Sequence, residues 1–276
     1  MKKNLLVLAA FLIVVSGGCA KKAKDNIPVN TETDSVSVIQ TEAVSSDKEM
    51  TTSYVTVKTE ASEVPSEEDE GLYVFSENIT DNQCIVTLSY PFYGDGKHDA
   101  FDISMRNYAM QKYYQSGMFP EEGSIYEITR CEIMLETEYF VSAVVEGRII
   151  SPDATHDTVV AYTINADTGS GKIYLSEELI GDLTELRNAF IEGRFAQKSG
   201  MENIFSEISA EDIAQSWRSD YGIFPNMYFT ENTFGIAPEV PHALIGTACF
   251  EIPYENTGNM INSVAKGLCG IIVTTD

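Results

Sequence analysis

Histidine is scarce in this sequence, and the motifs that position catalytic groups are missing. The 276 residues include three histidines, His98, His156 and His242, which lie far apart in the chain. No H-E-x-x-H, G-x-S-x-G or P-loop pattern occurs, so no motif positions a zinc ion, a serine nucleophile or a phosphate. The sequence therefore predicts no catalytic residue, no metal site and no cofactor.

Basic residues are also few, and this shortage restricts the classes of partner. The chain has 18 lysines and arginines against 42 aspartates and glutamates, a net charge of −24. Such a charge excludes nucleic acid backbones and anionic membrane surfaces as partners. The field of the protein favours basic proteins, cationic peptides or metal ions. An exported protein can equally be acidic merely for solubility, and composition leaves both interpretations open.

The chain has one long apolar run, residues 5–15 (LLVLAAFLIVV), which is shorter than the roughly 20 residues of a membrane-spanning helix. Two lysines precede the run and three small residues separate it from Cys19, a layout typical of a secretory signal peptide. The segment resembles a bacterial lipobox, apart from Ser16 where leucine is usual. We expect a signal peptide over 1–18, lipid attachment at Cys19, and a location on the outer face of the bacterial cytoplasmic membrane. The alternative is a plain secretory signal with an incidental cysteine.

The segment after Cys19 lacks glycine and bulky apolar clusters. Residues 20–70 contain two prolines, 14 serines or threonines, and 12 acidic residues against five lysines. Such a stretch buries too little apolar surface to offset the entropy of ordering it. We expect residues 19–70 to be a disordered acidic tether that, as a flexible coil, reaches roughly 40 Å.

Five cysteines occur, and four of them follow the tether: Cys84, Cys131, Cys249 and Cys269. Outside the cell, an even number permits two disulfides in any of three pairings. Cys84 and Cys131 lie in alternating apolar series, however, and a cysteine on a core face behaves as a small apolar residue. Bonded and free cysteines both remain open, and the lack of C-x-x-C argues against a redox motif or a zinc knuckle.

Periodic patterning of apolar residues is strong in the remaining part, 71–276. Spacings of three and four residues predict helices at about 99–116, from a cap at Asp182 toward Gln197, and at 209–217. Alternation and turn signals predict strands over 83–91, 124–136, 138–150, 156–166, 227–230, 233–236, 249–254 and, weakly, 268–274. This order predicts an α+β fold, an antiparallel sheet meander with two main helices packed on it. Two halves, 71–166 and 167–276, are expected to share one core.

Two groups of residues are candidates for contact with a ligand. His156 and Asp157 could form an orienting pair for a general base, whereas a histidine in a loop at a strand end is the plainer interpretation. The aromatic clusters 90–93, which include Tyr93, and 113–114 exceed what single-faced elements bury. Such clusters form protein or sugar contacts, or they fill the core.

Three segments together resemble a known family. They are residues 86–91 (VTLSYP) with the helix that follows, residues 159–179 (VVAYTINADTGSGKIYLSEEL), and residues 227–254, which end in FEIPY. In order and spacing, most of 72–256 is similar to the extracellular domain of RsiV-type anti-sigma factors. It is also similar to the non-catalytic N-terminal region of PdaC-type peptidoglycan deacetylases. Loop 151–157 departs from the family pattern because it lacks a Gly-Gly-x-His.

The resemblance implies an α+β domain with no catalytic residues of its own. Together with the lipobox, it predicts a lipid-anchored, extracytoplasmic, non-enzymatic binding domain. The RsiV type resembles a receptor for lysozyme, so the expected partner is a basic protein such as lysozyme, or a cell-wall component. We expect His156, Asp157, Tyr93, Glu239 and His242 to contact this ligand. The alternatives are a cell-wall-active hydrolase that uses scattered acids and a lipoprotein that helps another envelope protein to assemble.

Overall fold

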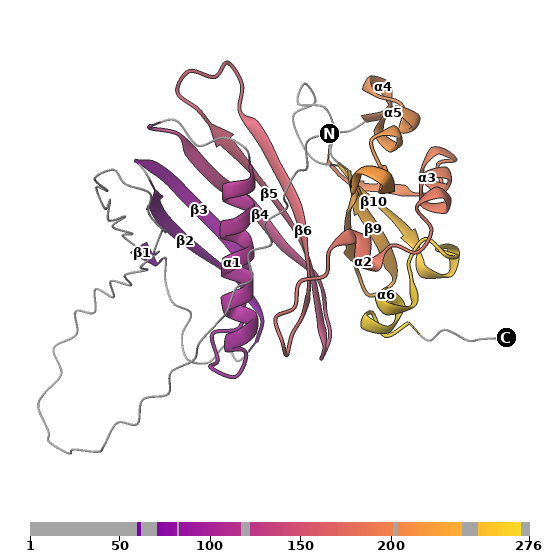
Figure 1. Cartoon of the computed structure of the whole chain (residues 1–276), viewed down its shortest axis with the longest axis horizontal. Coiled ribbons are helices and arrows are strands. Elements are labelled where there is room, and N and C mark those ends of the chain that lie inside the picture. The colour runs from indigo at the N-terminus through magenta and orange to yellow at the C-terminus, as the bar shows by residue number, and fades with distance from the viewer. Residues whose placement is uncertain are drawn as a thin grey trace, which may run out of the picture. The chain divides into compact units, whose positions relative to one another are not determined.

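The computed structural model describes residues 60–61, 71–81, 83–116, 122–200, 204–238 and 248–271. The N-terminal part of these residues forms a six-stranded sheet in the order β1-β2-β3-β4-β5-β6 (Figure 1). The strands are β1 (Glu60–Ala61), β2 (Tyr73–Asp81), β3 (Cys84–Phe92), β4 (Ile125–Glu136), β5 (Phe140–Ile150) and β6 (Thr158–Asp167). The two-residue strand β1, which pairs with Asn78 and Glu77 of β2, is the described portion of the segment expected to be a tether.

Helix α1 (Asp99–Gln115) connects β3 to β4 and lies across one face of the six-stranded sheet (Figure 1). The strand–helix–strand crossover makes β3 and β4 parallel, whereas the other neighbours in this sheet are antiparallel. The buried face of α1 repeats every four residues, as the apolar spacing predicts: Phe101, Met105, Ala109 and Tyr113.

An ion pair between the partly exposed Arg106 and the buried Glu77 joins α1 to β2. Arg106 donates through Nε and Nη2 to the two carboxylate oxygens of Glu77, at 2.7 and 3.2 Å. Tyr90 of β3 donates its hydroxyl to the same carboxylate at 2.9 Å. Because Glu77 is 3% exposed, the guanidinium and the hydroxyl offset the cost of burying its charge.

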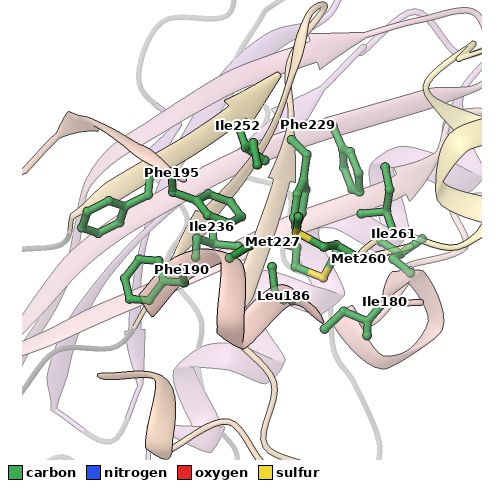
Figure 2. Packing of buried hydrophobic residues seen from close by; sticks show 14 of the residues in the cluster. Ile180, Leu186, Phe190, Phe195, Met227, Phe229, Ile236, Ile252, Met260 and Ile261 are labelled. Carbon is green, nitrogen blue, oxygen red and sulfur yellow. The ribbon is translucent and has the colours of Figure 1, made fainter. Parts of the chain in front are cut away.

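The C-terminal part forms a four-stranded antiparallel sheet in the order β7-β10-β9-β8. Its strands are β7 (Ala196–Ser199), β8 (Asn226–Phe229), β9 (Thr233–Ala237) and β10 (Cys249–Pro253). The helices of this part are α2 (Ser176–Leu179), α3 (Leu183–Ile191), α4 (Ile204–Glu207), α5 (Ala210–Gln215) and α6 (Ser263–Leu268), with 3-10 turns at Ser219–Tyr221 and Tyr254–Asn256. Leu186 and Phe190 of α3 pack against this sheet, where Figure 2 shows them beside Met227 and Ile236.

Each half has its own main cluster of buried apolar residues. The core that the sequence predicts to be common to the two halves is therefore common only in part. Leu135 and Phe140 of the first sheet belong to the cluster of the second half. A small third cluster, formed by Val144 of β5 with Tyr228, Ala237 and Cys249, joins the two sheets.

Two buried polar side chains also join the sheets. Asn165 of β6 donates through Nδ2 to the Met227 carbonyl at 2.8 Å, and the Phe229 N–H donates to Ser142 Oγ at 2.9 Å. Ser142 in turn donates to Asn165 Oδ1 at 2.9 Å. The outer edge of β8 is therefore hydrogen-bonded by side chains of the first sheet instead of by another strand.

The α+β class is confirmed, and the structure differs from the expected single antiparallel sheet in two respects. The described residues form two sheets, and β3 and β4 are parallel. The helix expected to reach Gln197 ends at Ile191, because Gly193 adopts a left-handed conformation (φ 72°) that terminates it. Leu268, expected to begin a strand, ends α6 instead.

Among the described residues, Cys131, Cys249 and Cys269 are free cysteines. Burial raises the pKa of Cys131, and likewise that of Cys269, to about 12. Both thiols are therefore protonated at neutral pH and behave as small apolar groups. None of the helices in the described ranges is both long and apolar enough to cross a membrane.

Candidate functional site

The structure places the predicted ligand residues at opposite ends of the first sheet. Tyr93 follows β3 and contacts Glu136, the last residue of β4. Asp157 lies in the loop between β5 and β6 and contacts Arg148, which pairs with Glu127 near the start of β4. Glu127 and Glu136 are nine positions apart on this extended strand, a distance of about 30 Å. One small ligand therefore cannot contact both Tyr93 and Asp157.

Of the remaining predicted residues, the structure describes only His156. His156 is exposed in the same loop as Asp157. Glu239, His242 and the lipidation residue Cys19 lie outside the described residues.

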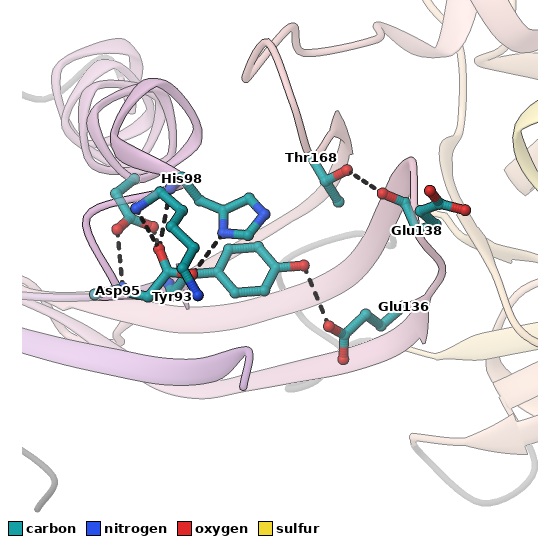
Figure 3. A network of polar contacts seen from close by, with 9 residues as sticks. Tyr93, Asp95, His98, Glu136, Glu138 and Thr168 are labelled. Carbon is teal, nitrogen blue, oxygen red and sulfur yellow. Dashed lines mark hydrogen bonds and ion pairs between the residues drawn. The ribbon is translucent and has the colours of Figure 1, made fainter. Parts of the chain in front are cut away.

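Tyr93 is the centre of a polar network (Figure 3). Its ring stacks on the imidazole of His98, with centroids 4.0 Å apart and planes 24° apart. Its hydroxyl donates to Glu136 at 3.2 Å, and a 2.9 Å hydrogen bond joins His98 Nδ1 to Asp95 Oδ2. The half-buried tyrosine ring is thus held on one side by an imidazole and at its tip by a carboxylate.

The loop that carries Tyr93 is fixed by two aspartates. Asp102, in the first turn of α1, accepts the N–H groups of Tyr93 and Gly94, both at 2.9 Å. Asp95 accepts the N–H groups of Lys97 and His98. These bonds use backbone donors around the start of α1, where negative charge is favourable.

Two further turns converge on the same end of the sheet. Thr168 donates its hydroxyl to the Glu138 carbonyl at 2.7 Å, and its N–H donates to the Tyr139 carbonyl at 3.2 Å. Gly171 lies against α1, where an added Cβ would collide with the Ala100 carbonyl. We call the surface formed by residues 93–98, 136–139 and 167–171 the Tyr93 end.

The Tyr93 end combines exposed aromatic surface with carboxylates. Tyr139 is 63% exposed, and Glu136 and Glu138, which precede it in the chain, are exposed as well. Burial, followed by the charge of Glu136, raises the pKa of Tyr93, so this hydroxyl remains a donor at neutral pH. Aromatic faces and carboxylates both attract lysine and arginine side chains.

Two carboxyl groups at this end have lowered pKa values. Hydrogen bonds from the hydroxyl and the N–H of Ser170 lower the pKa of Asp167. Burial acts to raise the pKa of Asp95, but hydrogen bonds from Lys97 and His98 outweigh it, and the net direction is downward. Both groups are therefore anionic at neutral pH.

At the opposite end, an arginine contacts two carboxylates. Arg148 contacts Glu127 at 2.9 Å and Asp157 at 3.5 Å, and all three side chains are more than a third exposed. Exposed pairs of this kind contribute little to stability. A cation already occupies the carboxylates there, which leaves this end less attractive to a basic partner than the Tyr93 end.

Sequence reasoning missed His98, Asp95, Glu136 and Glu138. The spacing of Asp95 and His98, three residues apart at the start of a predicted helix, is a local signal that could have identified this pair. Glu136 comes from a strand 43 residues away from Tyr93, so no local pattern links them. Within the described ranges, histidine, cysteine and acidic side chains form no group of three or more that could hold a metal ion.

Comparisons with known proteins find similarity only to solved structures, at low sequence identity. No protein-family model and no curated protein matches the chain. The chain is similar to the structure of a DUF3298 family member from Bacteroides fragilis NCTC 9343, with 12% identity and a TM-score of 0.44, covering 75% of this chain and 99% of that chain. It is also similar to a DUF3298 family protein from Pseudomonas aeruginosa PAO1, with 9% identity and a TM-score of 0.39, covering 71% of this chain and 96% of that chain.

The name of both neighbours denotes a domain of unknown function, and at these TM-scores neither supports an argument about activity or ligand. They are compatible with the predicted resemblance at this coarse level. Membership of the RsiV or PdaC type specifically stays a prediction.

Proposed function

We propose that this chain is a lipid-anchored, non-enzymatic binding domain on the outer face of the bacterial cytoplasmic membrane, and that the Tyr93 end binds a basic protein. Lysozyme is the partner that the resemblance to the RsiV type suggests, and a cell-wall component is the second. The observation that carries the proposal is the exposed Tyr139 ring, which follows the exposed Glu136 and Glu138 on turns held by internal hydrogen bonds. Rigid turns reduce the entropy lost on binding.

The charge of the chain supports a basic partner. A net charge of −24 accelerates association with a cationic protein. Two basic side chains outside the Tyr93 end, Arg106 and Arg130, already contact other carboxylates of the chain. They therefore do little to neutralise the carboxylates of the Tyr93 end.

The hydrolase alternative has less support. A general acid needs a carboxyl group with a raised pKa. The shifts at the Tyr93 end are in the opposite direction, because the pKa values of Asp95 and Asp167 are lowered. Anionic carboxylates suit the recognition of a cation better than proton donation.

Titration calorimetry of the purified full-length protein with a basic animal-type lysozyme tests the proposal. We expect micromolar or tighter binding at low salt that persists at physiological salt, because aromatic contacts are not screened. The double variant Glu136→Gln/Glu138→Gln should weaken binding about tenfold or more. The expected loss corresponds to removing two charge-assisted contacts.

The matched control is Asp153→Asn/Asp157→Asn, which removes two carboxylates at the opposite end of the sheet. We expect it to weaken binding less than about threefold, through the long-range field alone. Equal losses in the two double variants would show that overall charge matters and that the Tyr93 end is not the site. Binding that disappears at physiological salt would eliminate lysozyme as the partner.

A further inference from the structure

One histidine belongs to the Tyr93 end, and it lies against the ring at the centre of that surface. The imidazole of His98 stacks on Tyr93 with ring centroids 4.0 Å apart, as Figure 3 shows. Phe101 packs edge-on against the same tyrosine ring, at 5.3 Å. A partner that approaches the Tyr93 ring therefore comes close to the imidazole of His98 as well.

The residue type of His98 is the one that responds to moderate changes in pH. Histidine is the side chain whose charge ordinarily changes between pH 5 and pH 8. The other titratable residue types at the Tyr93 end are aspartate, glutamate, lysine and tyrosine, which ordinarily titrate outside that range. The side chain of His98 is 33% exposed, so it exchanges protons with solvent. The charge of this surface therefore changes in that range through His98.

Carboxylates predominate among the charged groups around His98. Asp95 is in direct contact, because its Oδ2 lies 2.9 Å from His98 Nδ1. The other charged residues of the Tyr93 end, the adjoining first turn of α1 and the turn after β6 are Lys97, Asp99, Asp102, Glu136, Glu138, Asp167 and Lys172. Lys172 bonds to Glu178 at 2.9 Å. The surface is therefore anionic while the imidazole is neutral.

Protonation of the imidazole would change this surface in two ways. An imidazolium pairs with Asp95 and cancels the charge that this carboxylate presents to a partner. It also places a cation against the Tyr93 ring, which then attracts a lysine or arginine of the partner less strongly. Both changes oppose the binding of a basic protein.

The position of the imidazole does not have to change with its charge. A neutral imidazole with its proton on Nδ1 donates to Asp95, and an imidazolium donates through the same nitrogen. The loop is held by other groups, since Asp102 accepts the N–H groups of Tyr93 and Gly94 at 2.9 Å. His98 can therefore alter the charge of the surface while its shape stays constant.

We propose that His98 makes binding at the Tyr93 end dependent on pH, so that its protonation in mildly acidic solution weakens the complex with a basic protein. This inference rests on the proposed function, because it concerns the regulation of the same surface. A unit charge about 4 Å from a cation of the partner in water changes an equilibrium constant about fivefold. We therefore expect the charge on His98 to weaken binding about three- to fivefold.

Titration calorimetry of the full-length protein with a basic animal-type lysozyme, at about pH 7.8 and about pH 5.8 and constant ionic strength, tests the proposal. The comparison is between the parent protein and His98→Gln, which can still bond to Asp95 but carries no charge at either pH. Between the two pH values, the parent should lose about three- to fivefold more affinity than this variant. Titration of groups on lysozyme affects both proteins equally and cancels in the comparison.

Two further variants complete the experiment. His98→Phe keeps an aromatic ring beside Tyr93 without a titrating group, and its affinity should change with pH as that of His98→Gln does. His156→Gln removes an exposed histidine at the opposite end of the first sheet and should behave like the parent. A pH dependence that persists in both His98 variants, or that disappears in His156→Gln, would overturn the role of His98.

The same titrations separate this inference from the proposed function. Equal losses of affinity in the parent and in His98→Gln, with binding retained at about pH 7.8, would refute the control by His98 and leave the proposed function intact. Absence of binding at both pH values would contradict the binding of lysozyme at the Tyr93 end and, with it, the control of that binding by His98.

Discussion

Asn165 and Ser142 show how single polar residues define the contact between the two sheets. Both side chains are buried, at 2% and 0% exposure, and each bonds to the other and to the backbone of β8. An apolar pair at these positions would leave the Met227 carbonyl and the Phe229 N–H buried without partners. The two residues are therefore required by the backbone groups that they face.

Replacing Asn165 with alanine should destabilise the protein by about 1–3 kcal/mol, the cost of leaving buried groups unsatisfied. Chemical denaturation measures this loss as a lower midpoint with an unchanged slope. The control is Asn107→Ala on the exposed face of α1, which should be neutral or slightly stabilising because alanine favours helix. Equal effects of the two substitutions would contradict the role assigned to Asn165.

Glu77 explains why strand β2 was not predicted from the sequence. In β2, Tyr73, Phe75, Glu77 and Ile79 occupy alternate positions, and Glu77 and Ile79 are buried. A glutamate in this series interrupts the apolar alternation on which a strand prediction depends. Its partner Arg106 is 29 residues away, so the compensation that permits burial cannot be seen locally.

Helices and strands whose apolar periodicity is uninterrupted were predicted correctly from the sequence. The strands β4, β5 and β6, the helix α1 and the hairpin of β8 and β9 agree with the predictions within a few residues. The short elements β7 and α6 were missed because they are stabilised by neighbours as much as by their own sequence. Asn262, whose Oδ1 accepts the Ala265 N–H at 3.0 Å, is a cap signal that could have identified α6.

The turn between β6 and α2 depends on one glycine. Gly171 has a φ of +68°, and an added Cβ would collide with the Ala100 carbonyl of α1. Gly171→Ala should therefore lower the free energy of unfolding by more than about 1 kcal/mol. Gly169 in the same turn is the matched control, because a Cβ there would meet its nearest atom at 3.7 Å.

Urea denaturation of both glycine variants measures the difference. We expect Gly169→Ala to remain within about 0.5 kcal/mol of the parent protein. If Gly171→Ala behaved like Gly169→Ala, the close approach of this turn to α1 would not constrain the Tyr93 end.

For the molecule as a whole, one strand pairing decides which of the predicted ligand residues lie at the same end of the first sheet. In an entirely antiparallel sheet, the end of β3 would lie beside the start of β4, at the same end as loop 151–157. Tyr93, His156 and Asp157 would then form one site. Because α1 makes β3 and β4 parallel, Tyr93 lies beside Glu136 at the other end. Residue types indicate which side chains could contact a ligand, but the topology of the sheet decides which of these side chains lie close together.

The net charge of −24 acts on the folded chain as a whole. Like charges held on a compact body repel each other, and salt screens this repulsion, with a Debye length that falls from about 30 Å at 0.01 M to about 8 Å at 0.15 M. Tm should therefore rise by a few degrees across this range, as measured by differential scanning calorimetry. Sucrose at matched osmolality controls for solute effects. A fall in Tm would mean that attractive ion pairs outweigh the repulsion.

The side-chain bonds along β8 have a consequence for self-association. A strand at the edge of a sheet normally presents free backbone groups with which another chain can pair, and such edges promote aggregation. On β8 the Met227 carbonyl and the Phe229 N–H are already occupied by Asn165 and Ser142. The opposite edge strand, β7, has four residues and carries Lys198 with its side chain 51% exposed. The smaller sheet is thus protected from intermolecular strand addition at both edges, by internal bonds on one side and by shortness and charge on the other.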